Sequence, residues 1–214
     1  MTKAAPLVII SSLPVILGCA LLGATEARAI PYLVTIDQEG LNVVATGSGN
    51  IDLTGLTFLT TGSSEGNINP SIGDVTVGSA VQAAFFTGTF SGPTNFGSGG
   101  GDFAEVADSF SGNLVFFVCC EMNIRPSAVP QIGVPLGYAN DSPLGISTAT
   151  WDNATFASLG ITPGHYFWSW GPAADQSFTL NAVPAPIVGA GLPGLIAALG
   201  GLVAMARRRR KQLA

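Results

Sequence analysis

Between residues 30 and 183, short stretches of β-branched and aromatic side chains alternate with glycine, asparagine, serine and proline. This pattern is typical of strands joined by turns, and it predicts an all-β domain built as a β-sandwich or a jelly roll. Helical periodicity is limited to Phe103–Phe110, with one or two turns, and to Thr155–Leu159, with a single turn. The predicted strands are Leu33–Asp37, Leu41–Thr46, Gly49–Leu53, Asp74–Val77, Ala83–Phe90, Leu114–Cys120, Ser147–Asp152, His165–Trp170 and Ser177–Leu180.

The densest aromatic stretch is GHYFWSWG, residues 164–171. On a strand, Tyr166, Trp168 and Trp170 share one face, because successive side chains point to opposite sides. This face either packs between two sheets, as large rings usually do, or forms an exposed platform on which sugar rings stack. Turn residues at both ends of the strand favour core packing. Trp151 is the better candidate for an exposed ring, so the candidate carbohydrate-stacking residues are Trp151, Trp168 and Trp170.

The first 29 residues have the organisation of a secretory signal peptide. A lysine precedes a largely apolar run, which is followed by the A-x-A pattern that signal peptidase cleaves. Recognition of Ala27 and Ala29 would leave Ile30 as the first residue of the mature chain. The alternatives are a lipoprotein with an acylated Cys19, in the stretch ILGC, and a retained N-terminal anchor.

Residues 187–206 contain no charged side chain, and five basic residues follow them at once: Arg207, Arg208, Arg209, Arg210 and Lys211. A helix of this length rises about 30 Å, the thickness of a hydrocarbon core, which predicts a membrane-spanning helix. An amphipathic helix docked on a soluble core would instead need a polar face. Because clustered Lys and Arg stay cytoplasmic, the residues before the helix are expected on the outer side.

The predicted ectodomain is strongly acidic. Residues 30–183 hold twelve of the thirteen acidic residues but only one of the eight basic residues, Arg125, which gives a formal charge of −11. Nucleic acid is therefore not expected as a partner, because phosphate binding rests on Lys and Arg. Cations, water and neutral sugars remain compatible with such a surface, and the acidity also favours solubility.

Cysteine and histidine are too few for a disulfide scaffold or a zinc site, since only Cys119, Cys120 and His165 remain after signal cleavage. Neighbouring cysteines on a strand point to opposite faces, so a bridge between them would distort the backbone. Two buried thiols, or one thiol paired with another chain, are the expected arrangements.

The loop FGSGGGDF, residues 96–103, is similar to a single calcium-binding β-roll repeat, but no second copy follows. Calcium binding would require the oxygens of Asp102, Glu105 and Asp108 to converge. The prediction is that neither a metal nor a cofactor is bound. The sequence carries no motif of a hydrolase nucleophile, a phosphate-binding loop or a zinc protease, so a non-enzymatic protein is expected.

The C-terminal elements resemble, in order and position, the tripartite PEP-CTERM sorting signal of Gram-negative bacteria. Val183, Pro184, Ala185 and Pro186 stand where that family has its proline motif, with Ala185 at the position usually taken by Glu. The resemblance implies processing by exosortase, a membrane-embedded protease-transpeptidase, and association with exopolysaccharide or biofilm material. Residues 150–180 also resemble the last strands of many such ectodomains, a recurrent structural pattern without assigned chemistry.

The expected precursor is anchored in the inner membrane with a periplasmic ectodomain, and it ends at the cell surface or in the extracellular matrix. Its expected partners are signal peptidase, an exosortase-like protease, the membrane and exopolysaccharide. The alternatives are a carbohydrate-binding module, which needs exposed rings, and a surface glycosidase, which needs two carboxylates in a groove. The expected divisions are a signal peptide (1–29), a β-sandwich ectodomain (30–182) and a sorting signal (183–211) with its proline motif (183–186), transmembrane helix (187–206) and basic cluster (207–211).

Overall fold

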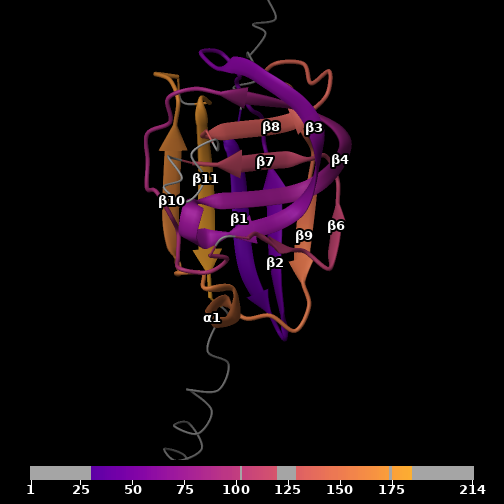
Figure 1. Ribbon diagram of the computed structural model, residues 1–214, viewed down its shortest axis with the longest axis vertical. Coiled ribbons are helices and arrows are strands. Elements are labelled where there is room, and N and C mark those ends of the chain that lie inside the picture. Colours follow the sequence, from indigo (N-terminus) through magenta and orange to yellow (C-terminus); the bar gives the residue numbers. More distant parts are fainter. Residues whose placement is uncertain (1–29, 102, 120–128, 174, 185–214) are drawn as a thin grey trace, which may run out of the picture.

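The computed structural model describes residues 30–101, 103–119, 129–173 and 175–184. The predicted signal peptide, membrane-spanning helix and basic cluster lie outside these residues. Within them, no helix is both long enough and apolar enough to cross a membrane. The described residues form eleven strands in two sheets, with one short α-helix and one 3-10 turn, Pro70–Ile72 (Figure 1). The all-β prediction is confirmed.

The first sheet contains six strands in the order β10-β11-β1-β2-β9-β6. Strands β1 and β11 run parallel, and the other pairs in this sheet are antiparallel. The last strand of the domain thus lies beside the first, with Val183 opposite Asp37. The bounds are β1 Tyr32–Glu39, β2 Asn42–Ser48, β6 Ser109–Ser111, β9 Ser147–Trp151, β10 Gly164–Ser169 and β11 Ser177–Val183.

The second sheet has the order β5-β3-β4-β7-β8. Its bounds are β3 Thr57–Asn69, β4 Asp74–Thr87, β5 Glu105–Val106, β7 Val115–Val118 and β8 Gln131–Pro135. Strand β4 changes direction near Gly78, whose φ of 70° is a left-handed value that glycine tolerates. The first half of β4 pairs with β7 and the second half with β8, while β7 and β8 pair with each other. These three strands therefore close on themselves, and the long β3–β4 hairpin curves around one side of the molecule (Figure 1).

The main core lies between the two sheets, and strand alternation selects its members. In β1, Tyr32, Val34 and Ile36 are fully buried, whereas the residues between them are partly exposed. At the centre, Phe117 of β7 stacks on Phe178 of β11 with ring centroids 4.3 Å apart. Aromatic packing therefore joins one sheet to the other.

A second, smaller cluster lies on the opposite face of β4, β7 and β8. Phe85 and Phe116 meet there edge to face, with centroids 5.5 Å apart. Gly133 is the register partner of both residues. A Cβ atom at this position would stand 2.7 Å from the Phe85 ring, so the packing of the two rings requires glycine at position 133.

The structure corrects several predicted elements. The strands predicted at Asp74–Val77 and Ala83–Phe90 belong to one continuous strand, β4. The strand predicted at Gly49–Leu53 is wrong, because this stretch is an irregular connection whose backbone bonds the Tyr138 hydroxyl. The helix predicted at Phe103–Phe110 is also wrong, because β5 and β6 lie there and gain backbone pairing with β3 and β9.

The predicted helical turn at Thr155–Leu159 is confirmed as α1, Phe156–Leu159. Its cap explains why so short a helix forms: the Thr155 hydroxyl accepts a hydrogen bond from the Ser158 amide at 3.0 Å, and Ser158 returns one to the Thr155 amide at 2.8 Å. The sequence patterns gave no prediction of β3 or β8. Most of β3 is exposed on both faces, so it has no alternation to detect.

Cys119 departs from the expected arrangement of free thiols. It is 1% exposed and disulfide-bonded, while Cys19 and Cys120, the other two cysteines, lie outside the described residues. The prediction of a buried free thiol at this position is therefore wrong.

Candidate functional site

The three tryptophans are core residues. Trp151, Trp168 and Trp170 are 2%, 0% and 8% exposed. Each indole N–H donates to a backbone carbonyl of a distant segment, at 3.2, 2.6 and 2.8 Å respectively. For Trp151 the acceptor is Glu105 of β5, the strand whose position the helix prediction had missed. The predicted exposure of Trp151 is therefore wrong, and the core-packing interpretation of Trp168 and Trp170 is confirmed.

Three of the predicted processing residues fall within the described part of the chain. Ile30 is 70% exposed and Val183 is 46% exposed, so both ends of the domain reach its surface, and Pro184 directly follows β11. The processing signals stay predictions. Outside the described residues lie Ala27, Ala29, Ala185, Pro186 and the basic cluster Arg207, Arg208, Arg209, Arg210 and Lys211.

The residues considered for calcium have separate surroundings. The Asp108 carboxylate accepts a hydrogen bond from the Asp152 amide at 2.8 Å. Glu105 borders a hollow of about 270 Å³ together with Asp152 and Asn153. Asp102 lies outside the described residues. Across the ranges that the structure describes, no three His, Cys, Asp or Glu side chains form a group that could hold a metal ion.

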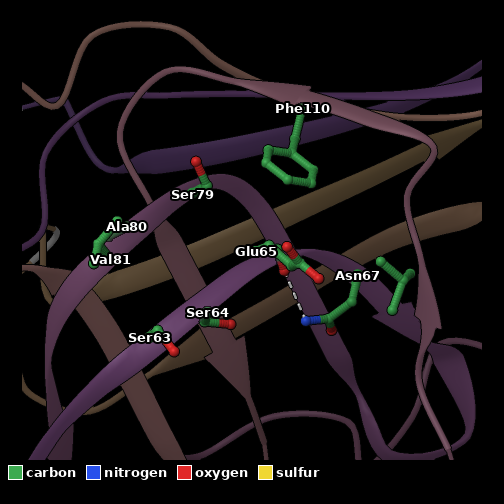
Figure 2. A pocket seen from close by; sticks show the side chains of 9 residues that line it. Ser63, Ser64, Glu65, Asn67, Ser79, Ala80, Val81 and Phe110 are labelled. Carbon is green, nitrogen blue, oxygen red and sulfur yellow. Dashed lines mark hydrogen bonds between the residues drawn. The ribbon is translucent and has the colours of Figure 1, made fainter.

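A larger hollow opens between the β3–β4 hairpin and the short strands β5 and β6 (Figure 2). We call it the hairpin groove. Its volume is about 570 Å³, within the range of small-molecule sites. The lining residues are Ser63, Ser64, Glu65 and Asn67 of β3, Ser79, Ala80 and Val81 of β4, Val106 of β5 and Phe110 of β6.

Irregularities in β3 shape the hairpin groove. The β3–β4 register shifts between Gly62 and Ser64 and again between Glu65 and Asn67. Such bulges redirect side chains and are frequent beside functional sites. Gly66 lies within the second shift, where a Cβ atom would stand 3.2 Å from the Cβ of Phe110 and 2.9 Å from that of Ala149. The missing side chain thus lets β6 approach β3 and bring its aromatic ring to the groove.

One wall of the hairpin groove is polar. The hydroxyls of Ser63, Ser64 and Ser79 make no hydrogen bond to any described residue, and the Glu65 carboxylate has neither a hydrogen bond nor an ion pair there. The Asn67 amide is fixed by donating to the Glu65 carbonyl at 2.9 Å (Figure 2). Three hydroxyls and one carboxylate are therefore free to bond a ligand.

The other wall is apolar. Phe110 is 37% exposed, and its ring points toward the side of the groove formed by Ser79 and Glu65 (Figure 2). Val106 of β5 is 53% exposed, and Val81, on the same strand as Ser79, is 90% exposed. An aromatic ring facing free hydroxyls is a combination that binds amphipathic ligands with one apolar face and several polar groups.

The electrostatic surroundings of the groove are negative. The described residues include ten of the chain's thirteen acidic residues, and none of its eight Lys and Arg residues lies among them. The other ionisable side chains among the described residues are those of the tyrosines and of His165 of β10. The carboxylates of this region therefore have no Lys or Arg partner within the described ranges, and their field favours cations.

The carboxyl of Asp74, which lies outside the groove, has a shifted pKa. Asp74 begins β4, is 7% exposed, and its Oδ1 atom has no hydrogen-bond partner. Burial raises the pKa of this carboxyl to about 8, because water no longer solvates the charged form. Asp74 is therefore mostly protonated at neutral pH, and it affects stability rather than the groove.

No family model, no curated protein and no solved structure matches this chain.

Sequence reasoning missed the hairpin groove. Its aromatic residue, Phe110, falls in the stretch predicted to be helical, and Glu65 lies in the run TTGSSEGN, which has no hydrophobic alternation. A small signal was present in the Ser-Gly-rich composition of that run, because glycine inside a strand often marks a bulge. The approach of residues 63–67 to residues 106–110 around the groove depends on tertiary contacts that local composition does not encode.

Proposed function

We propose that this chain is an exported, surface-sorted, non-enzymatic protein that associates with extracellular polysaccharide. The observation that carries the association is the hairpin groove, where the exposed ring of Phe110 faces unpaired serine hydroxyls. Sugar rings combine apolar C–H faces, which stack on aromatic side chains, with hydroxyls that exchange hydrogen bonds. This is the chemistry that the two walls offer.

A glycosidase is less well supported by the same groove. That reaction uses a pair of carboxylates on either side of the scissile bond. Glu65 is the one carboxylate among the nine described residues that line the hairpin groove. A binding role, in which hydroxyls and one ring hold the sugar without cleaving it, fits the lining better.

Export and sorting rest on the two ends of the chain. In the proposal, residues 1–29 are a signal peptide and residues 183–211 a PEP-CTERM-like signal, on either side of a β-sandwich ectodomain. The exposed Val183 ends β11, so a protease could reach the proline motif without unfolding the sheet. Two prolines in this motif disfavour helix and keep the segment extended.

Intact-mass analysis of the protein from its native envelope tests the sorting proposal. A measured mass that corresponds to a chain from Ile30 to a residue near Pro184 would support both cleavages. A chain that retains the basic cluster would show permanent anchoring instead, and a chain that begins at Met1 in the cytosol would contradict export.

Affinity electrophoresis of the full chain, solubilised in detergent, in gels that contain envelope polysaccharide tests the association. We expect retardation that Phe110→Ala abolishes. Phe167→Ala is the matched control, because Phe167 is a similarly exposed phenylalanine on β10, away from the groove. Equal retardation of all three proteins would contradict a role for the hairpin groove.

A further inference from the structure

We propose that the hairpin groove selects polysaccharides that carry protonated amino groups over neutral or acidic ones. This inference rests on the proposed association with polysaccharide and adds the charge class of the ligand. It follows from three features of the structure: the position of Glu65, the ring of Phe110 and the charge balance around them.

Among the described residues that line the hairpin groove, Glu65 has the only charged side chain. It is exposed, stands opposite Ser79 in the β3–β4 register, and forms no ion pair with any described residue. A bulge follows Glu65 in β3, and the side chains of Glu65 and Phe110 line the same groove. A ligand ammonium would therefore find a carboxylate without having to displace an existing cationic partner, and charge-assisted hydrogen bonds are the stronger kind.

Phe110 adds a second attraction for the same group. The face of an aromatic ring is negative, so a ligand cation within about 6 Å of it is stabilised. In Figure 2 the ring and the Glu65 carboxylate approach the groove from opposite walls. An amino sugar can lay its apolar face on the ring while its ammonium group lies near the carboxylate.

The charge balance of the described residues acts in the same direction. With ten acidic residues and no Lys or Arg, these residues repel uronic acids and sulfated or phosphorylated sugars at long range. This field extends over about 10 Å at 0.1 M salt, whereas the contact with Glu65 is local. Neutral sugars carry no charge, so neither the long-range field nor the Glu65 carboxylate attracts them as it attracts an ammonium group.

A lysine-rich peptide is the other cationic occupant to consider. The groove favours an amino sugar because Ser63, Ser64 and Ser79 leave three hydroxyls unpaired within the described residues. A hydroxyl both donates and accepts, which matches the hydroxyls of a sugar ring. A lysine side chain offers only donors at its end and would leave most of these groups unused.

Two oligosaccharides with the same linkage and length provide the test: β-1,4-linked glucosamine and its N-acetylated form. Calorimetry with the full chain in detergent at low salt should show tighter binding of the amine form by about tenfold, the value of one charge-assisted hydrogen bond. Glu65→Gln should reduce this preference to the parts contributed by the Phe110 ring and the long-range field. Glu39→Gln, which removes one exposed carboxylate on β1 outside the groove, should preserve it.

The outcomes separate this inference from the proposed function. If both oligomers bind equally and Phe110→Ala weakens both, the groove binds sugars but the selectivity for amines is wrong. If neither oligomer binds, and envelope polysaccharide does not bind either, the proposed function fails as well. If a lysine oligomer of equal charge binds more tightly than the glucosamine oligomer, and Glu65→Gln removes this difference, the groove recognises basic peptides and the inference is overturned.

Discussion

Phe117 and Phe178 stack almost parallel across the two sheets, with ring centroids 4.3 Å apart and ring planes inclined by 6°. Both residues are fully buried, and both rings also lie near Trp168, at 5.0 and 6.1 Å. The stack therefore connects β7 of one sheet with β10 and β11 of the other. It is the point at which removal of a single side chain should most directly weaken the packing of the two sheets.

Phe117→Ala should lower the free energy of unfolding by about 3–5 kcal/mol, because it removes a buried ring and leaves a cavity between the sheets. Phe167→Ala, at a position that is 49% exposed, should change it by no more than about 0.5 kcal/mol. Urea titration followed by tryptophan fluorescence measures both values. Similar losses for the two variants would show that the central stack does not hold the sheets together.

Gly133→Ala should destabilise the fold by about 1–3 kcal/mol, because the added methyl group would stand 2.7 Å from the Phe85 ring. The measurement is a double-mutant cycle in urea with Phe85→Leu, which shortens the side chain that clashes. The loss in the double variant should be smaller than the sum of the two single losses. Strictly additive losses would place the cost of Gly133→Ala in the backbone rather than in this contact.

Asp74 should make the protein less stable as the pH rises. Its pKa is about 8 in the folded chain and has the ordinary value of 3.8 in the unfolded chain, so folding takes up a proton between these values. The stabilising contribution is complete below pH 3.8 and is lost as the pH rises toward about 8, with a slope of up to about 1.4 kcal/mol per pH unit.

Asp74→Asn should remove this dependence, and urea midpoints at several pH values between 4 and 9 measure it. Glu39→Gln, at an exposed position, should leave the dependence in place. An unchanged slope in Asp74→Asn would mean that another group causes it.

Tyr138→Phe should destabilise the fold by about 1–3 kcal/mol. The hydroxyl of Tyr138 accepts from the Ile51 amide at 3.0 Å and lies 3.1 and 2.7 Å from the carbonyls of Ile51 and Ser142, so its removal leaves backbone groups without a partner. Tyr166→Phe is the control, because its hydroxyl makes a single exposed bond to a carbonyl at 2.8 Å. Thermal unfolding measures the loss of stability in both variants. Equal losses would contradict a stabilising role for the hydrogen bonds of the Tyr138 hydroxyl.

The sequence by itself determined the class of the fold and several of its elements. Alternation in β1 and β9 placed both strands, because period-2 burial appears wherever one face of a strand meets a core. The turn at Thr155 was also local, since a threonine hydroxyl caps the helix within its own segment. The predicted signal peptide and sorting signal at the two chain ends are equally local, because each consists of short runs of basic, proline or apolar residues.

Only the tertiary structure decided which faces are covered. Alternation shows that Trp151 and Trp168 belong to particular faces, but burial depends on what β5 and the residues around Pro93 place over them. Most of strand β3 is exposed and is held by its long pairing with β4, so this part of the strand has no periodic signal. The hairpin groove depends on such distant pairing, because it brings Glu65 and Phe110 together across more than forty residues of chain.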